Sequence, residues 1–213
     1  MRNKIFWLIT GVPTLAAVLM AASFPDPPKV ALAPASGTKS VVLAGGCFWG
    51  LEGIYEHVKG VVDTKVGYAG GAANTAHYET VSDGNTGHAE SIKITYDPSK
   101  VTYGELLKIF FGAAHDPTTL NRQHYDVGTQ YRSAIFYADD EQKTVAESYI
   151  KELDTAKVFK SKIVTQIVPL KAFYQAEDYH QHYLDHNPKQ PYIAQVDIPL
   201  LNSYKATFPE FYK

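Results

Sequence analysis

Cys47 is the only cysteine in the 213 residues of the chain, and it lies between a glycine and an aromatic pair in the stretch 46–50. A cysteine thiolate is a strong nucleophile. At a helix N-terminus its pKa is expected to be lowered, because unpaired amides and the helix dipole favour the anion. The sequence predicts such a position, since an apolar run at 41–44 and two glycines precede apolar residues at helical spacing over 47–58. These residues predict strand, turn and helix, with a reactive thiol in the first helical turn.

The neighbours of Cys47 favour a substrate site. Gly45, Gly46 and Gly50 carry no side chains that would obstruct the sulfur, although the same glycines could simply form a tight turn. Trp49 lies off the apolar stripe of the predicted helix, so we expect it to form a wall beside the thiol. Free cysteines are often buried as small hydrophobic residues, so the thiol alone does not establish chemistry.

Glu90 is the candidate proton donor. It stands at the head of a predicted strand at 91–96, and period-two alternation places it on the same face as Ile92 and Ile94. Apolar surroundings disfavour an ionised carboxylate and raise its pKa toward the range of a useful general acid. A frayed strand end would instead leave Glu90 solvated, and the spacing leaves both possibilities open.

The remaining pattern predicts an α+β fold. Predicted strands lie at 41–44, 61–68, 91–96, 131–137 and 162–168, and predicted helices at 47–58, 102–113, 139–153 and 172–186. The order β-α-β-β-α-β of the first six elements indicates a two-layer sandwich with a ferredoxin-like, split βαβ core, to which a strand and helices are added. The long segments 68–88 and 115–130 are expected to be active-site loops, because loops of this length are commonly functional.

Composition and the N-terminal segment define the domain organisation. With 45% hydrophobic residues, 13% aromatics and a net charge of -2, the chain is typical of globular proteins, and no nucleic-acid partner is expected. Residues 1–23 predict a signal peptide or an uncleaved N-terminal anchor, and 24–38 a Pro-rich linker. Residues 39–213 are expected to form a single catalytic domain and a monomer. Export, to a bacterial periplasm, is the expected localisation, with membrane attachment only if the segment is uncleaved.

Five short motifs in the sequence resemble those of a known protein family. They are GCFWG at 46–50, GYAGG at 67–71, TGHAE at 86–90, GTQYRS at 128–133 and AEDYHQHY at 176–183. Together and in this order they resemble the A-type peptide methionine sulfoxide reductases, and the match runs from about Val41 to Asn187. The resemblance implies that Cys47 attacks the sulfur of methionine S-sulfoxide, free or in a protein, while Glu90 protonates the oxygen. Methionine leaves, and Cys47 becomes a sulfenic acid.

The resemblance also implies roles for five further residues. Phe48 and Trp49 match the apolar wall that holds the substrate methyl group. Tyr78 and Tyr131 match the family's hydroxyl donors near the sulfoxide oxygen, and Asp126 matches its supporting carboxylate. No metal and no tightly bound cofactor are expected. The implied biological role is the repair of oxidised proteins.

Two departures from the family pattern affect the expected mechanism. His124 and Tyr125 stand where the family often has Gly-Asn, which is expected to alter the pocket rim. Many members use a second, resolving cysteine, and Cys47 has no such partner in the sequence. Its sulfenic acid must then be reduced by an external thiol, either a thioredoxin-like or glutaredoxin-like protein or a low-molecular-weight thiol.

A metal-dependent hydrolase is the first alternative. His182 and His186 are one helical turn apart in the predicted last helix, with His180, Glu177 and Asp178 nearby. Two histidines at this spacing can bind zinc. The sequence lacks the H-E-x-x-H order that would supply a general base, which makes a solvated polar face the better interpretation.

Two other classes remain open from the residues alone. A cysteine hydrolase would pair Cys47 with His88 or His115, although no local signature of such a family accompanies the cysteine. A binding module would use Trp49 and tyrosines to hold an oxidised or methylated ligand without chemistry, and Cys47→Ser would then leave affinity intact.

Overall fold

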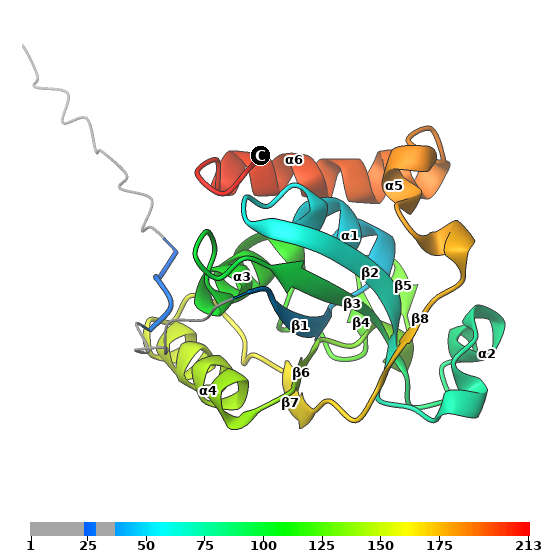
Figure 1. The fold of residues 1–213 in the computed structure, drawn as a ribbon, viewed down its shortest axis with the longest axis horizontal. Helices are drawn as coiled ribbons and strands as arrows, with labels where there is room; N and C mark the ends of the chain where they lie inside the picture. The colour runs from blue at the N-terminus through cyan, green and yellow to red at the C-terminus, as the bar shows by residue number, and fades with distance from the viewer. Residues whose placement is uncertain (1–23, 29–36) are drawn as a thin grey trace, which may run out of the picture.

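The computed structural model describes residues 24–28 and 37–213, so the predicted signal or anchor at 1–23 lies outside the described residues. A six-stranded sheet with the order β7-β6-β1-β3-β2-β8 forms the centre, and β4 and β5 form a separate two-stranded sheet (Figure 1). The strands are β1 (Lys39–Ala44), β2 (Val61–Ala69), β3 (Ala89–Tyr96), β4 (Arg122–Gln123), β5 (Asp126–Val127), β6 (Ala134–Tyr137), β7 (Gln166–Pro169) and β8 (Phe173–Gln175).

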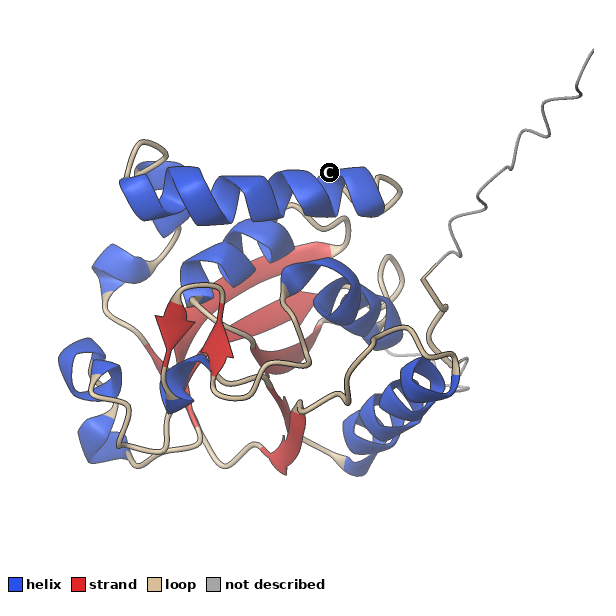
Figure 2. Ribbon diagram, turned by 180° about the vertical axis from the view of Figure 1, so that it is seen from behind, coloured by secondary structure: helices blue, strands red, loops and turns tan. Residues whose placement is uncertain are grey.

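The helices complete the second layer and the periphery, as the view from behind shows (Figure 2). They are α1 (Phe48–Glu56), α2 (Tyr78–Ser82), α3 (Tyr103–Ile109), α4 (Asp140–Thr155), α5 (Tyr183–His186) and α6 (Ile198–Thr207). Helix α3 continues into a π-helical turn at Phe110–Ala114, and a second π-helical turn at Ile193–Asp197 leads into α6. Within the described residues, no helix is long and apolar enough to span a membrane.

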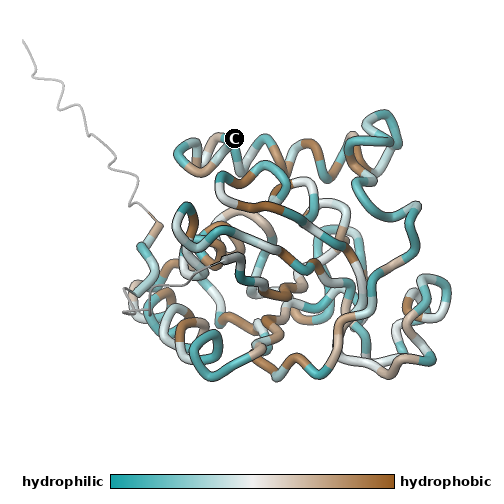
Figure 3. Tube along the Cα trace, in the orientation of Figure 1, coloured by the Kyte–Doolittle hydropathy of each residue, from teal (hydrophilic) through white to brown (hydrophobic). Residues whose placement is uncertain are grey.

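The two faces of β1 explain the layering. Val41 and Leu43 belong to the main core, which also takes in residues of α1, α3, α4 and α6. Val42 and Ala44 belong to a smaller cluster on the opposite face, against which Phe173 packs. Because successive side chains of a strand point to opposite faces, one short apolar strand serves both layers. Figure 3 shows the hydrophobic stretches in the interior and hydrophilic residues along many of the outer turns.

The predicted ferredoxin-like core is present. The inner strands have the order β6-β1-β3-β2, and β1 and β2 both pair antiparallel with β3, which separates them as a split βαβ unit requires. Two strands are added rather than the single one expected, with β7 parallel to β6 at one edge and β8 antiparallel to β2 at the other. Strand β8 lies within the stretch that the sequence predicts to be helical.

The pattern of Thr102 followed three residues later by Glu105 predicts a capping box, and α3 begins with one. The Glu105 amide donates to the Thr102 hydroxyl at 3.1 Å, and the Thr102 amide donates back to the Glu105 carboxylate at 2.7 Å. Both donors would otherwise lack partners at a helix start, so the reciprocal bonds fix the first turn.

The fourth and fifth predicted strands are shorter than expected. Residues Thr129–Tyr131 form a 3₁₀ turn, so the strand predicted at 131–137 begins only at Ala134. The turn is held by side chains: the Gln130 amide donates to the Ser82 carbonyl at 3.0 Å, and Arg132 donates to the carbonyl of His88 at 3.0 Å. The strand predicted at 162–168 is confined to Gln166–Pro169.

The prediction of a continuous helix at 172–186 is wrong. This segment forms β8, a 3₁₀ turn at Asp178–His180 and the short α5. The Gln181 side chain explains the break, because it accepts from the Val66 amide and donates to the Val66 carbonyl, both at 3.1 Å, and so ties the segment to β2. His182 has φ 55°, in the left-handed region, which ends any continuous helix there.

Residues 24–28, within the predicted linker, pack on the domain. The Phe24 ring makes an edge contact with Phe208, with centroids 6.1 Å apart, and Lys108 forms an ion pair with Asp26 at 2.6 Å. The Tyr149 hydroxyl donates to the Pro25 carbonyl at 2.7 Å. The prolines of this segment favour an extended conformation, in which it lies along the surface of the domain.

Candidate active site

A cavity of about 180 Å³ brings together all seven residues that the sequence predicts for the site. The start of α1, the head of β3, helix α2, strand β5 and the 3₁₀ turn after it supply them, and the segment after α5 adds two more. The lining residues are Cys47, Phe48, Trp49, Tyr78, Glu90, Asp126, Tyr131, Gln190 and Tyr192. The long loops predicted at 68–88 and 115–130 thus contribute to one pocket.

The glycines around Cys47 allow close packing. Gly46 has φ +96°, and a Cβ there would lie 2.8 Å from the Gln123 side chain. A Cβ on Gly45 would lie 2.9 Å from the ring of His115. The expectation that these glycines keep an open path to the sulfur is therefore wrong, because other side chains occupy the space. They make the strand-to-helix turn tight and bring the β4 strand against it.

Cys47 is the N-cap residue of α1, as the spacing predicts. The expected lowering of its pKa is wrong: burial raises the pKa of the Cys47 thiol well above its usual value, and the carboxylates of Glu90 and Asp197 raise it further. A hydrogen bond from the Trp49 amide favours the thiolate and lowers the pKa, but it does not offset these effects. The thiol at this site is therefore protonated at neutral pH.

Glu90 is buried, which excludes a frayed strand end, although Tyr78, Asp126 and Tyr131 make its surroundings partly polar. Only 2% of its surface is exposed, and its carboxylate accepts one hydrogen bond, from the Phe48 amide at 3.1 Å. Burial raises the pKa of Glu90 to about 8, and the amide of Phe48 partly counters the shift. At pH 7 a carboxyl group with this pKa is mostly protonated and can donate a proton.

Phe48 and Trp49 form an apolar wall of the cavity. Phe48 is fully buried and packs against Tyr68, with ring centroids 5.9 Å apart. The Trp49 ring stacks on Tyr183 at 3.9 Å with an interplanar angle of 10°. The Trp49 indole donates to Nδ1 of His180 at 3.1 Å, so that ring nitrogen must be unprotonated. Contacts with Tyr68, His180 and Tyr183 thus hold the two rings in place.

Tyr78, Tyr131 and Asp126 complete the polar side of the cavity. Burial raises the pKa of Tyr131 and of Tyr78, and Glu90 adds to both shifts, so both hydroxyl groups keep their protons and can donate. Asp126 accepts a short hydrogen bond from the Tyr192 hydroxyl, and burial raises the pKa of its carboxyl group. The donors and the carboxyl groups face the same space as the thiol.

Several residues of the site were not predicted from the sequence. Gln190 and Tyr192 line the cavity, and His180 anchors Trp49. Asp197 is buried close to Cys47, and burial raises its pKa to about 7. Three of the four follow Pro188, where the last predicted helix ends, and no periodic pattern marks them.

His124 and Tyr125, the departure from the family pattern, are not among the residues that line the cavity. They lie in a neighbouring groove together with Gln195, Val196 and Leu200. Tyr125 is 85% exposed. His124 also lines a small cavity together with Cys47 and Tyr192, so the departure lies beside the pocket, and its effect on the rim stays a prediction.

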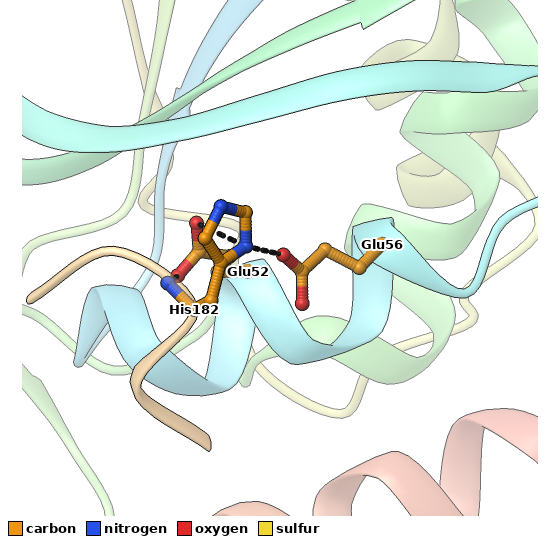
Figure 4. A group of neighbouring side chains, drawn as sticks. All are labelled: Glu52, Glu56 and His182. Carbon is orange, nitrogen blue, oxygen red and sulfur yellow. Dashed lines mark hydrogen bonds and ion pairs between the residues drawn. The ribbon is translucent and has the colours of Figure 1, made fainter. Parts of the chain in front are cut away.

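Of the histidines in the metal-hydrolase alternative, His182 and His186 lie with ring centroids 6.2 Å apart, whereas His180 is engaged elsewhere. His180 bonds Trp49, and Glu177 accepts from the Tyr68 hydroxyl at 2.9 Å. Among the described residues, the only three-residue group of potential metal ligands joins Glu52 and Glu56 of α1 with His182 (Figure 4).

Hydrogen bonds within the protein join Glu52, Glu56 and His182, although Oε2 of Glu56 has no partner among the described residues. Glu52 accepts from the His182 amide at 2.7 Å, and the His182 ring bonds Glu56, which raises the pKa of that histidine. These bonds fix the segment that carries His180 to α1.

The cysteine-hydrolase alternative lacks its base. Both ring nitrogens of His88 bond the main chain, with Gly71 at 3.2 Å and Ala72 at 3.0 Å. The His115 ring bonds the Phe110 carbonyl and the Ser133 hydroxyl, and burial lowers its pKa to about 4. Neither histidine lines the cavity with Cys47.

The comparisons with known proteins identify the family of the chain. The family model described as peptide methionine sulfoxide reductase matches residues 39–210. The chain is 54% identical over 178 residues to "Peptide methionine sulfoxide reductase MsrA 2" of Mesorhizobium japonicum, covering 84% of this chain and 91% of that protein. It is 52% identical over 176 residues to the protein of the same name from Synechocystis, covering 83% and 82%.

Solved structures give the same result. The crystal structure of reduced Mxr1 from Saccharomyces cerevisiae superposes with a TM-score of 0.65 at 41% identity, covering 72% of this chain and 87% of that one. Methionine sulfoxide reductase A of Corynebacterium diphtheriae gives 0.63 at 38% identity, covering 78% and 84%. The chain therefore belongs to the peptide methionine sulfoxide reductase A family. It is an oxidoreductase that reduces methionine sulfoxide.

Proposed function

We propose that the enzyme reduces methionine S-sulfoxide, free or in a protein, with Cys47 as nucleophile and Glu90 as proton donor. The observation that carries the proposal is a buried Glu90 with a pKa of about 8 in the same cavity as the only cysteine. A sulfoxide oxygen is a poor leaving group until it is protonated, and an acid that stays neutral at pH 7 supplies that proton.

The chemical step exchanges oxygen between two sulfur atoms. The Cys47 sulfur attacks the substrate sulfur while Glu90 protonates the oxygen, and the hydroxyl group then passes to Cys47 as the bond to methionine breaks. The methionine sulfur gains two electrons, and Cys47 loses two and becomes a sulfenic acid.

The cavity offers a matching partner for each part of the substrate. Phe48 and Trp49 would hold the methyl group by apolar contact. Tyr78 and Tyr131 would donate hydrogen bonds to the sulfoxide oxygen, which is a strong acceptor. Asp126 would support this network from its bond with Tyr192.

Regeneration would use an external thiol. Cys47 is the only cysteine in the chain, so an internal disulfide cannot form. A thioredoxin-like or glutaredoxin-like protein, or a low-molecular-weight thiol, would condense with the sulfenic acid, and a second thiol would release the mixed disulfide. We propose protein repair in an exported, periplasmic setting as the biological role, with a signal peptide or anchor at 1–23.

A single-turnover experiment tests the proposal. Reduced full-length protein is mixed with stoichiometric methionine S-sulfoxide and no other thiol, and methionine, intact mass and free thiol are measured. About one methionine per protein is expected, with Cys47 trapped by dimedone as a sulfenic acid. The R epimer is the matched control substrate and is expected to give none, because the two epimers are handled by different enzymes.

A failed turnover would also be informative. If no methionine forms and the Cys47 thiol stays titratable, the pocket binds without reacting and the binding-module alternative becomes the better one. Ester or amide turnover under the same conditions would instead favour a cysteine hydrolase.

A further inference from the structure

Asp197 is a buried carboxyl group beside the first turn of α1. It ends the π-helical turn at Ile193–Asp197, and only 2% of its surface is exposed. One oxygen lies 2.6 Å from where a Cβ on Gly50 would be. The other oxygen, Oδ2, is buried and has no hydrogen-bond partner in the part of the chain that the structure describes.

A small second cavity connects Asp197 with the thiol. Cys47 and Tyr192 line both this cavity and the substrate pocket, whereas Glu90 lines only the pocket and Asp197 only the second cavity. The second cavity has room for about one water molecule. A water in this cavity would border both residues and would let a proton pass from the thiol to Asp197, a relay that general bases use.

No structural role accounts for Asp197. A buried carboxyl group with an unpartnered oxygen destabilises a fold, because it loses hydration without gaining a bond. The ionisable groups around it are Cys47, Glu90, Asp126 and Tyr192, together with His124, which lines the same small cavity. Burial and the Asp126 carboxylate raise its pKa to about 7, so both its forms are populated near neutral pH.

The proposed reaction requires a group that accepts the proton of the Cys47 thiol. Glu90 must hold its proton in order to donate it to the sulfoxide oxygen, so it cannot at the same moment accept the proton of the thiol. The Cys47 thiol is protonated at neutral pH and must lose that proton as its sulfur attacks.

We propose that Asp197 accepts the proton of the Cys47 thiol as the sulfur attacks the sulfoxide. The inference rests on the proposed function and adds its missing group. The S–H bond of Cys47 breaks, a bond to the substrate sulfur forms, and the thiol proton goes to the Asp197 carboxylate. Glu90 gives its proton to the oxygen, which ends as the sulfenic hydroxyl group. The proton on Asp197 then returns through solvent to Glu90, so the net reaction consumes none.

The test compares wild type with Asp197→Asn, which keeps the shape and removes the base. Methionine formed in a single turnover is measured across pH, with Asp185→Asn as the matched control on an exposed residue of α5. We expect Asp197→Asn to be about 100-fold slower at pH 7, which is the lower end of general-base effects. The wild-type rate should rise through about pH 7 as Asp197 ionises, and in the variant this rise should move to higher pH.

A second readout separates a base from a structural or purely electrostatic role. Alkylation of Cys47 by iodoacetamide requires only the thiolate, and removing the Asp197 charge favours that form. The Asp197→Asn variant should therefore alkylate as fast as wild type or faster, although it makes methionine more slowly.

Three results would overturn the inference. One is a variant with the wild-type rate and pH profile, and another is a variant in which both rates fall together. The third needs no variant: a wild-type profile without any rise near pH 7. If wild type forms no methionine at all, it is the proposed function that fails.

Discussion

Replacing Glu90 by Gln tests the proton donor directly. The amide keeps the shape and can still accept the hydrogen bond from the Phe48 amide, but it has no proton to transfer. With a pKa of about 8, Glu90 is protonated in about 90% of wild-type molecules at pH 7 and in about 10% at pH 9. General acid catalysis contributes about 10²- to 10⁴-fold, or about 3–5 kcal/mol of barrier. We expect Glu90→Gln to be slower by this factor at pH 7.

The pH dependence distinguishes a lost proton donor from a damaged site. Above about pH 8 the wild-type rate should fall about tenfold per pH unit as Glu90 ionises, and the gap between wild type and variant should narrow. Single-turnover methionine formation from about pH 6 to about pH 9.5 gives both curves. Glu79→Gln, on an exposed residue of α2, is the matched control. A variant with the wild-type rate at pH 7, or a wild-type rate that stays flat above pH 8, would refute the assignment.

Four further outcomes are expected. Cys47→Ser should form no methionine in the single-turnover assay, because no other thiol is present in the chain. His180→Ala removes the acceptor of the Trp49 indole and should raise KM about 3- to 10-fold with a smaller change in kcat, as steady-state kinetics will show. Phe24→Ala should lower the free energy of unfolding by about 1–3 kcal/mol in urea titrations, because the Phe24 ring packs on Phe208. The loss is less than for a fully buried ring, because Phe24 is only partly buried. Because the folded pKa of Glu90 is raised from 4.5 to about 8, its contribution to stability is fully present below about pH 4.5 and is lost as the pH rises through about 8. Urea titrations should then show wild type losing up to about 5 kcal/mol relative to Glu90→Gln between pH 4.5 and 9.

The core of the fold could be predicted because each of its elements has a local signal. The apolar run before Cys47, the alternation after Glu90 and the Thr102 capping box each favour one conformation, and the structure agrees at all three. The segment from 172 onward has no such signal. Its conformation depends on long-range hydrogen bonds such as those between Gln181 and β2. Local sequence propensity therefore predicted a helix, whereas these contacts produce a strand and turns.

The candidate site was predictable where a motif or a strand position identified a residue. Residues that reach the pocket from the C-terminal segment, such as Tyr192 and Asp197, lie in no recognisable pattern, and their distance from Cys47 in the sequence conceals their proximity. The prediction of a lowered pKa for Cys47 was wrong for a related reason. The helix N-terminus is visible in the sequence, whereas the burial and the two carboxylates that outweigh it are properties of the assembled fold.

The raised pKa values of Cys47 and Glu90 have one consequence for the reaction. A thiol that stays protonated beside a neutral acid is a weak nucleophile toward most electrophiles, and a cysteine with no resolving partner is otherwise exposed to irreversible over-oxidation. In the proposed mechanism a sulfoxide would change this, because protonation of its oxygen by Glu90 would make its sulfur electrophilic at the moment when a base removes the thiol proton. The substrate itself would then trigger the attack, and a resting state without a thiolate would protect the Cys47 sulfur between turnovers.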